Sequence, residues 1–161
     1  KYSCPDERLV QALFVAAGFG AIIASRASIS GAEAGCQAEI GSASAMSAAA
    51  LVFLHGGSAG QMAQAAAMAL KNMMGLVCDP VAGLVEVPCV KRNVAGAMNA
   101  LSAAELALAG IESRIPADEV IDAMRAVGEA LPSALRETGR GGVAASPTAV
   151  AFRENFFGKQ A

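Results

Sequence analysis

The chain has 161 residues, a net charge of −2, and 55% hydrophobic against 16% charged residues. This length and composition suit one folded domain with a substantial core, and they exclude a disordered chain. Because lysine and arginine form no run and aromatic side chains are few, we expect no nucleic-acid partner.

The first half of the chain predicts two long helices. The first covers residues 5–25, with Pro5 in a first-turn position. Ser30 and Glu33 have the spacing of a capping box, in which a serine and a glutamate satisfy the first backbone N–H groups of a helix. This spacing predicts a second helix over residues 31–54.

A third helix and an irregular segment follow. Ser58 and Gln61 repeat the capping-box spacing and predict a helix over residues 58–75. Residues 75–89 then contain two prolines and two glycines, which do not suit a continuous helix. The best strand candidate in the chain is residues 84–87, and its signal is weak.

The second half predicts two more helices and a tail. One covers residues 90–109, and another covers residues 116–131, where a proline and two acidic residues open the first turn. The tail predicts loops and short elements. The chain as a whole predicts an all-α fold: a single compact helical domain, residues 1–161, of about five or more helices with one irregular loop.

The uncharged stretch of residues 40–70 makes a membrane span an alternative that must be weighed. Serines, glutamines and a break at residues 55–58 favour two buried helices and a turn instead. The polar start, residues 1–6, carries no export signal. We therefore expect a cytoplasmic protein with reduced cysteines and no membrane partner.

Two short motifs suggest a binding or catalytic function, but the surrounding sequence does not support either. Gly18 and Gly20 match part of a dinucleotide-binding loop, but Ile23 stands where the third glycine belongs, so helix packing is favoured. His55 is the only histidine and precedes two glycines, which is typical of a polar turn residue. A Cys–His nucleophilic pair stays formally open, although no spacing selects one.

The cysteines allow two interpretations. Cys36, Cys78 and Cys89 could be ordinary buried thiols, since cysteine is among the most buried residue types. They could also hold a metal cluster, because the segment between Cys78 and Cys89 can wrap an inorganic core and Lys91 and Arg92 can offset the charge of thiolates. Three thiolates on a [4Fe–4S] cluster leave one iron open as a Lewis acid.

Three blocks of the sequence resemble the signature blocks of the α chain of iron–sulfur L-serine dehydratases. They are ASISGAEAGCQAEIG at 27–41, GLVCDPVAGLVEVPCVKRN at 75–93 and RETGRGG at 136–142. Their order and separation agree with the family as well, and the resemblance covers about residues 9–145. It implies a [4Fe–4S] cofactor held by Cys36, Cys78 and Cys89, without PLP, while Cys4 inherits no role.

The resemblance also implies an activity. The family deaminates L-serine to pyruvate and ammonia, a carbon–nitrogen lyase reaction of serine degradation and gluconeogenesis, with an open cluster iron as the Lewis acid for the leaving hydroxyl. Candidates for binding the substrate carboxylate are Ser28, Ser30 and Arg140. The alternatives are that Ser30 is only a helix cap and Arg140 only a solvated loop charge. The catalytic base is not identified, because His55 has no counterpart in the family pattern.

The family pattern extends beyond this chain. It implies a further N-terminal part of the α region and a β domain or subunit, so we expect an oligomer and an inactive isolated chain. Arg26 and Gly139 depart from the residues common in relatives. The alternative function is a non-catalytic helical module, either membrane-associated or metal-binding. A PLP enzyme needs a Schiff-base lysine, and neither Lys71 nor Lys91 has a suitable setting.

Overall fold

Helices make up nearly all the regular structure of residues 4–158, the part of the chain that this computed structural model describes. In chain order they are α1 (Asp6–Arg26), α2 (Gly31–Ala34), α3 (Ser42–Leu54), α4 (Ala59–Met73), α5 (Cys89–Leu108), α6 (Ala117–Ala130) and α7 (Pro147–Phe157). Four short turns join them: the π-helical η1 (Gln37–Gly41) and the 3₁₀ turns η2 (Val81–Gly83), η3 (Ser133–Leu135) and η4 (Gly142–Ala145). The described residues contain no strand, so the all-α prediction is confirmed.

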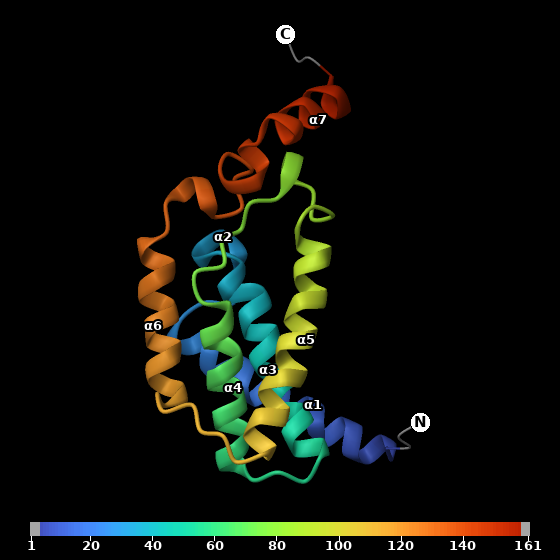
Figure 1. The fold of residues 1–161 in the computed structure, drawn as a ribbon, viewed down its shortest axis with the longest axis vertical. Helices are drawn as coiled ribbons and strands as arrows, with labels where there is room; N and C mark the ends of the chain where they lie inside the picture. Colours follow the sequence, from blue (N-terminus) through green and yellow to red (C-terminus); the bar gives the residue numbers. More distant parts are fainter. Residues whose placement is uncertain (1–3, 159–161) are drawn as a thin grey trace.

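Helices α3, α4, α5 and α6 run along the long axis of the molecule, and α7 extends beyond one end (Figure 1). α3 packs against α1, α4 and α5, and α4 also packs against α6. The irregular segments that follow α4 and α6 gather at the end of the bundle that also holds α2 (Figure 1). The three sequence blocks singled out above therefore lie at this end.

Small side chains let the central helices approach closely. The main core contains fully buried alanines such as Ala45 on α3 and Ala103 on α5, with larger side chains such as Leu70 between them. Gly96 of α5 lies against Ile40, where an added β-carbon would come within 2.7 Å of the Ile40 Cγ2 atom. Any larger residue at position 96 would push the helices apart.

Of the two glycines in α1, Gly18 and Gly20, one has a packing role. Both lie inside the helix, and no strand precedes them. A β-carbon at Gly20 would come within 2.9 Å of the Met46 side chain on α3, whereas one at Gly18 would meet nothing within 4 Å. Helix packing, as the sequence favoured, accounts for Gly20.

The predicted second helix is wrong as a continuous element. It is divided into α2, the π-helical η1 and α3. Gly35 separates the first two, because its φ of +80° lies in the left-handed region that ends a helix. This interruption places Cys36 at the start of a new turn instead of inside a long helix.

The two predicted capping boxes have different outcomes. The box at Ser58 is confirmed: its hydroxyl accepts from the Gln61 backbone N–H at 3.2 Å, and the Gln61 side chain accepts from the Ser58 N–H at 2.9 Å. The box at Ser30 is wrong, because the Ser30 side chain makes no capping bond. The hydroxyl of Ser28 instead accepts from the Ser30 N–H at 3.0 Å and donates to Glu33 at 2.5 Å.

The remaining elements follow the sequence, with two corrections. The first, third, fourth and fifth predicted helices end within about two residues of α1, α4, α5 and α6. Residues 84–87 form no strand, and most of this segment is a turn. The tail contains a true helix, α7, where Pro147 stands in the first turn and the Ser146 hydroxyl accepts from the Ala149 N–H.

Two helical segments are long and apolar enough to cross a membrane by length and composition alone. Gln37–Leu54 is 56% buried in the bundle, as expected of a core helix, whereas Asp6–Arg26 is only 17% buried. Core helices of soluble proteins pass the same test, so the absence of a membrane partner stays a prediction. The start of the chain, from which no export signal is expected, lies partly outside the described residues.

Candidate metal centre

Three cysteines from separate segments meet in one buried cluster. Cys36 precedes η1, Cys78 lies in the loop after α4, and Cys89 is the first residue of α5. Their exposed fractions are 0%, 2% and 8%, and they form a small core of their own with Ile40. The sulfurs of Cys36 and Cys78 lie within 4.8 Å of each other. None of the three is in a disulfide, so the cluster presents three thiols.

Gln37 fixes the position of Cys36. Its backbone N–H donates to the carbonyl of Leu76 at 2.9 Å, and its side-chain oxygen accepts from the Gly75 N–H at 2.8 Å. Its side-chain nitrogen donates to the carbonyl of Met124 on α6 at 3.1 Å. This buried amide, 1% exposed, thus ties the start of η1 to the loop that carries Cys78. A π-helical turn of this kind often marks a functional site.

The C-terminal block holds Cys78 from the other side. The Cys78 N–H donates to the carbonyl of Leu135 at 2.9 Å, and the Cys78 carbonyl accepts from the Glu137 N–H at 2.7 Å. These two bonds form an isolated parallel bridge between Cys78 and Arg136. The bridge explains why a block distant in sequence belongs to the same site.

One ion pair lies beneath the thiols. The Arg92 guanidinium contacts the Asp79 carboxylate at 2.6 Å and the Val77 carbonyl at 2.9 Å, and its Nη1 atom is 4.0 Å from the Cys36 sulfur. The other Asp79 oxygen accepts from the Val143 N–H at 2.6 Å. Burial lowers the pKa of Arg92, and the Asp79 hydrogen bond and charge raise it by more, so Arg92 stays cationic.

Lys91 and Arg92 were both expected to offset the charge of the thiolates, but only Arg92 is placed to do so. The side chain of Lys91 is exposed to solvent. Gly142, with φ of +60°, passes so close to Asp79 that an added β-carbon would collide with the carboxylate. The conformation of this glycine lets the backbone of residues 142–143 approach Asp79.

The environment of Cys78 and Cys89 raises the pKa of both thiols and keeps these two protonated when no metal is bound. Burial raises the pKa of Cys89 to about 11, with Cys36 adding to the rise and Arg92 opposing it. Burial also raises the pKa of Cys78, and the neighbouring Cys36 and the charge of Glu137 add to this effect. A soft metal ion binds thiolates, so binding here releases protons and strengthens as the pH rises.

A comparison with known protein families decides what kind of chain carries this centre. The model of the "Serine dehydratase alpha chain" family matches residues 1–144.

The chain belongs to this family.

Curated relatives agree with this assignment. The chain is 62% identical over 152 residues to a Bacillus subtilis protein named "Probable L-serine dehydratase, alpha chain", which covers 94% of this chain and 51% of the relative. A Latilactobacillus sakei protein of the same name is 61% identical, over 93% of this chain and 72% of its own length. The "L-serine dehydratase, alpha chain" of Peptoniphilus asaccharolyticus is 49% identical, over 97% and 53%. The chain thus spans about half the length of the first and third relatives.

The structure brings together only some of the residues predicted to bind the substrate, which are Ser28, Ser30 and Arg140. Ser28 and Ser30 are neighbours through the hydrogen bond described above, and Ser28 lines a pocket of about 200 Å³ with Glu33 and Arg136. Arg140 is exposed on the C-terminal block and shares no hydrogen bond or ion pair with either serine within residues 4–158. Their roles in binding substrate stay predictions.

Cys4 and His55 lie apart from the centre of this family member. Cys4 is partly exposed just before α1. His55 is exposed at the far end of α3, and the 18 residues of Gln37–Leu54 that separate it from Cys36 span roughly 27 Å at about 1.5 Å per residue. The distance agrees with the expectation that His55 is not the catalytic base.

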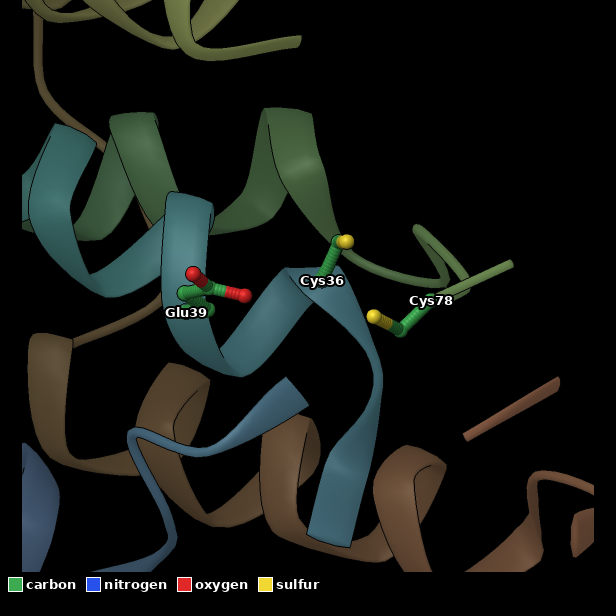
Figure 2. A group of neighbouring side chains, drawn as sticks. All are labelled: Cys36, Glu39 and Cys78. Carbon is green, nitrogen blue, oxygen red and sulfur yellow. The ribbon is translucent and has the colours of Figure 1, made fainter. Parts of the chain in front are cut away.

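Sequence reasoning missed three residues of the centre: Gln37, Asp79 and Glu39. A Glu39 carboxylate oxygen and the sulfurs of Cys36 and Cys78 all lie within 4.8 Å of one another (Figure 2). The spacing of three residues between Cys36 and Glu39 was the available signal, because it places two side chains on one helical face. No sequence pattern indicated that Gln37 or Asp79 would be buried.

Proposed function

We propose that this chain is the cluster-binding portion of an iron–sulfur L-serine dehydratase. The observation that carries the proposal is the convergence of Cys36, Cys78 and Cys89, from three separate segments, in a chain of the serine dehydratase α-chain family. Buried structural thiols have no need to meet. Three that pack into one buried cluster beside an arginine form a donor set for a soft, anionic metal centre.

The donor set fits a [4Fe–4S] cluster. Three thiols can hold three irons and leave the fourth without a thiolate. Gly31 leaves space on one side, because an added β-carbon there would lie 3.1 Å from the Cys78 sulfur and 2.9 Å from Glu39 Oε2. When bound, the cluster supplies a Lewis-acidic iron for the hydroxyl group that leaves serine.

The chain's own residues would bind and orient the substrate. Ser28 and Ser30 lie just before α2 and would offer their hydroxyl groups to the substrate carboxylate. Arg140 would offer the same carboxylate a positive charge. The pocket that Ser28 lines adjoins the thiols, because Arg136, on its wall, forms the backbone bridge with Cys78. The burial of the thiols excludes water from the metal side of the site.

The rest of the active site would come from outside this chain. Relatives named as an α chain suggest a β partner, which we propose as a separate subunit or as a domain of the same polypeptide. We assign the base that removes the Cα proton to these missing parts, because the described residues place no histidine near the thiols. The assembled enzyme would be a cytoplasmic oligomer.

The test compares the parent chain with four single Cys→Ser variants after anaerobic reconstitution, with bound iron and acid-labile sulfide as the measurement. Each variant at position 36, 78 or 89 should lose most of its iron, because a hydroxyl does not replace a soft thiolate. Cys4→Ser is the matched control and should retain it. Iron loss in the control together with retention in Cys78→Ser would refute the ligand assignment.

One observation favours the alternative of a membrane-associated module. Helix α1 is mostly exposed and carries apolar side chains such as Leu13 and Phe14, which are 69% and 74% exposed. Recovery of the expressed chain in the membrane fraction, without iron or sulfide after reconstitution, would favour this alternative.

A further inference from the structure

Glu39 is the acidic side chain of the thiol cluster. It lies on η1, one turn after Cys36, and its carboxylate shares the 4.8 Å grouping with the sulfurs of Cys36 and Cys78 (Figure 2). Its charge also acts on Cys89. One carboxylate therefore lies beside two of the three thiols.

No other interaction accounts for this position. Within residues 4–158 the Glu39 side chain makes no hydrogen bond and no ion pair. Two other acids near the thiols are engaged: Asp79 by Arg92, and Glu33 by the Ser28 hydroxyl. A carboxylate without a partner beside buried thiols is placed to contact a metal cation that those thiols bind.

Exposure distinguishes Glu39 from the thiols. Cys36 and Cys78 are buried, whereas Glu39 is exposed and stands at the edge of an open groove of about 390 Å³ between α1 and α3. Oxygen donors are harder than thiolates and bind iron less tightly than sulfur holds it in a cluster. A carboxylate on the solvent side is thus the donor that an incoming ligand can replace.

We propose that Glu39 is the fourth donor of this centre. Its carboxylate binds the metal position that the three thiolates leave open, and it yields that position to an oxygen of the substrate. The exchange replaces one oxygen donor by another, so no electron is transferred and the displaced carboxylate stays in the site. This inference rests on the proposed function, because it needs the cluster that Cys36, Cys78 and Cys89 would hold.

The experiment measures how easily the cluster loses its fourth iron. The parent chain, Glu39→Gln and Glu137→Gln are reconstituted anaerobically and treated with ferricyanide. Ferricyanide takes one electron from the [4Fe–4S] form, and one Fe²⁺ leaves to give a [3Fe–4S] form that electron paramagnetic resonance detects. Glu137→Gln is the matched control, because Glu137 acts on Cys78 by its charge but lies outside the Cys36–Glu39–Cys78 group.

Glu39→Gln should form the three-iron species roughly tenfold faster than the parent, in the range typical of losing a group that supports a metal site. Glu137→Gln should match the parent, and Glu39→Asp should restore part of the slower rate. Mössbauer spectra of labelled iron returned to the open position should differ between the parent and Glu39→Gln. Far-UV circular dichroism should be the same for all four proteins, since both glutamates are exposed.

Two results would overturn the inference, and they are distinguishable. If the parent holds a cluster and both glutamine variants lose iron at the parent rate with unchanged Mössbauer spectra, Glu39 is not a donor and the proposed function stands. If the parent binds no iron and sulfide at all, the proposed function fails and the role of Glu39 falls with it.

Discussion

Replacing Asp79 with asparagine removes the charge that connects three parts of the proposed metal centre. The Asp79 side chain is 2% exposed and that of Arg92 is 19% exposed, with 2.6 Å between their nitrogen and oxygen atoms. The same carboxylate also accepts from the Val143 N–H. The substitution therefore leaves a largely buried guanidinium without its counter-charge, and it weakens the attachment of the C-terminal block.

The loss of stability can be estimated from this geometry. Breaking a buried ion pair by removing one partner costs about 3–5 kcal/mol. Because asparagine keeps one oxygen acceptor and Arg92 retains some contact with water, we expect the lower end, about 3 kcal/mol. For a chain of this size that corresponds to a fall in Tm of roughly 6–12 °C.

The assay is urea and thermal unfolding followed by far-UV circular dichroism, with Glu129→Gln as the matched control. Glu129 pairs with Arg125 one turn away on α6, but at 4.0 Å and with both side chains more than half exposed. Such a surface pair contributes about 0.3–0.5 kcal/mol. If Asp79→Asn and Glu129→Gln destabilise the chain equally, the Arg92–Asp79 pair adds no more stability than a surface ion pair.

Three further predictions concern packing, oxygen and activity. Gly18→Ala should raise stability by about 0.5–1 kcal/mol through helix propensity, whereas Gly96→Ala should lower it by about 1–3 kcal/mol because its methyl group meets Ile40; equal effects in unfolding experiments would contradict the close packing of α5. The reconstituted protein should lose its visible absorbance and iron in air, since an iron without a thiolate is exposed to oxidants; unchanged absorbance after prolonged aerobic storage would count against an open iron. The cluster-loaded chain alone should form little or no pyruvate from L-serine, and full turnover would show that no other part of the enzyme is needed.

The helices could be predicted because their signals are local. Proline and acidic residues open α6, and Ser58 with Gln61 caps α4, as the sequence indicates. The error at Ser30 has a physical reason: the hydroxyl of Ser28 binds both the Ser30 N–H and Glu33, so the residues of the expected box have another partner. Capping patterns cannot distinguish these two arrangements without the backbone of residues 28–33.

The candidate metal centre, unlike the helices, depends on contacts that are not local in the sequence. The family resemblance pointed to three cysteines, which the structure brings into one buried cluster. The contacts that assemble this cluster join residues far apart in the chain. Gln37 binds the 75–76 turn and α6, and Asp79 binds Val143. Buried polar residues of this kind satisfy backbone groups that only the folded chain brings together, so neither periodicity nor spacing predicts them.

The long sequence separation within the centre has a consequence for its assembly during synthesis. Cys36 leaves the ribosome about 100 residues before Val143, whose N–H completes the Asp79 contacts beneath the thiols. At translation rates of about 5–20 residues per second, its thiol waits roughly 5–20 seconds for the rest of the site. Cys78 and Cys89 emerge before Val143, but the backbone bonds that hold Cys78 come from Leu135 and Glu137. The thiols are therefore not fixed in place until the C-terminal block is made, so cofactor delivery would follow translation of that block.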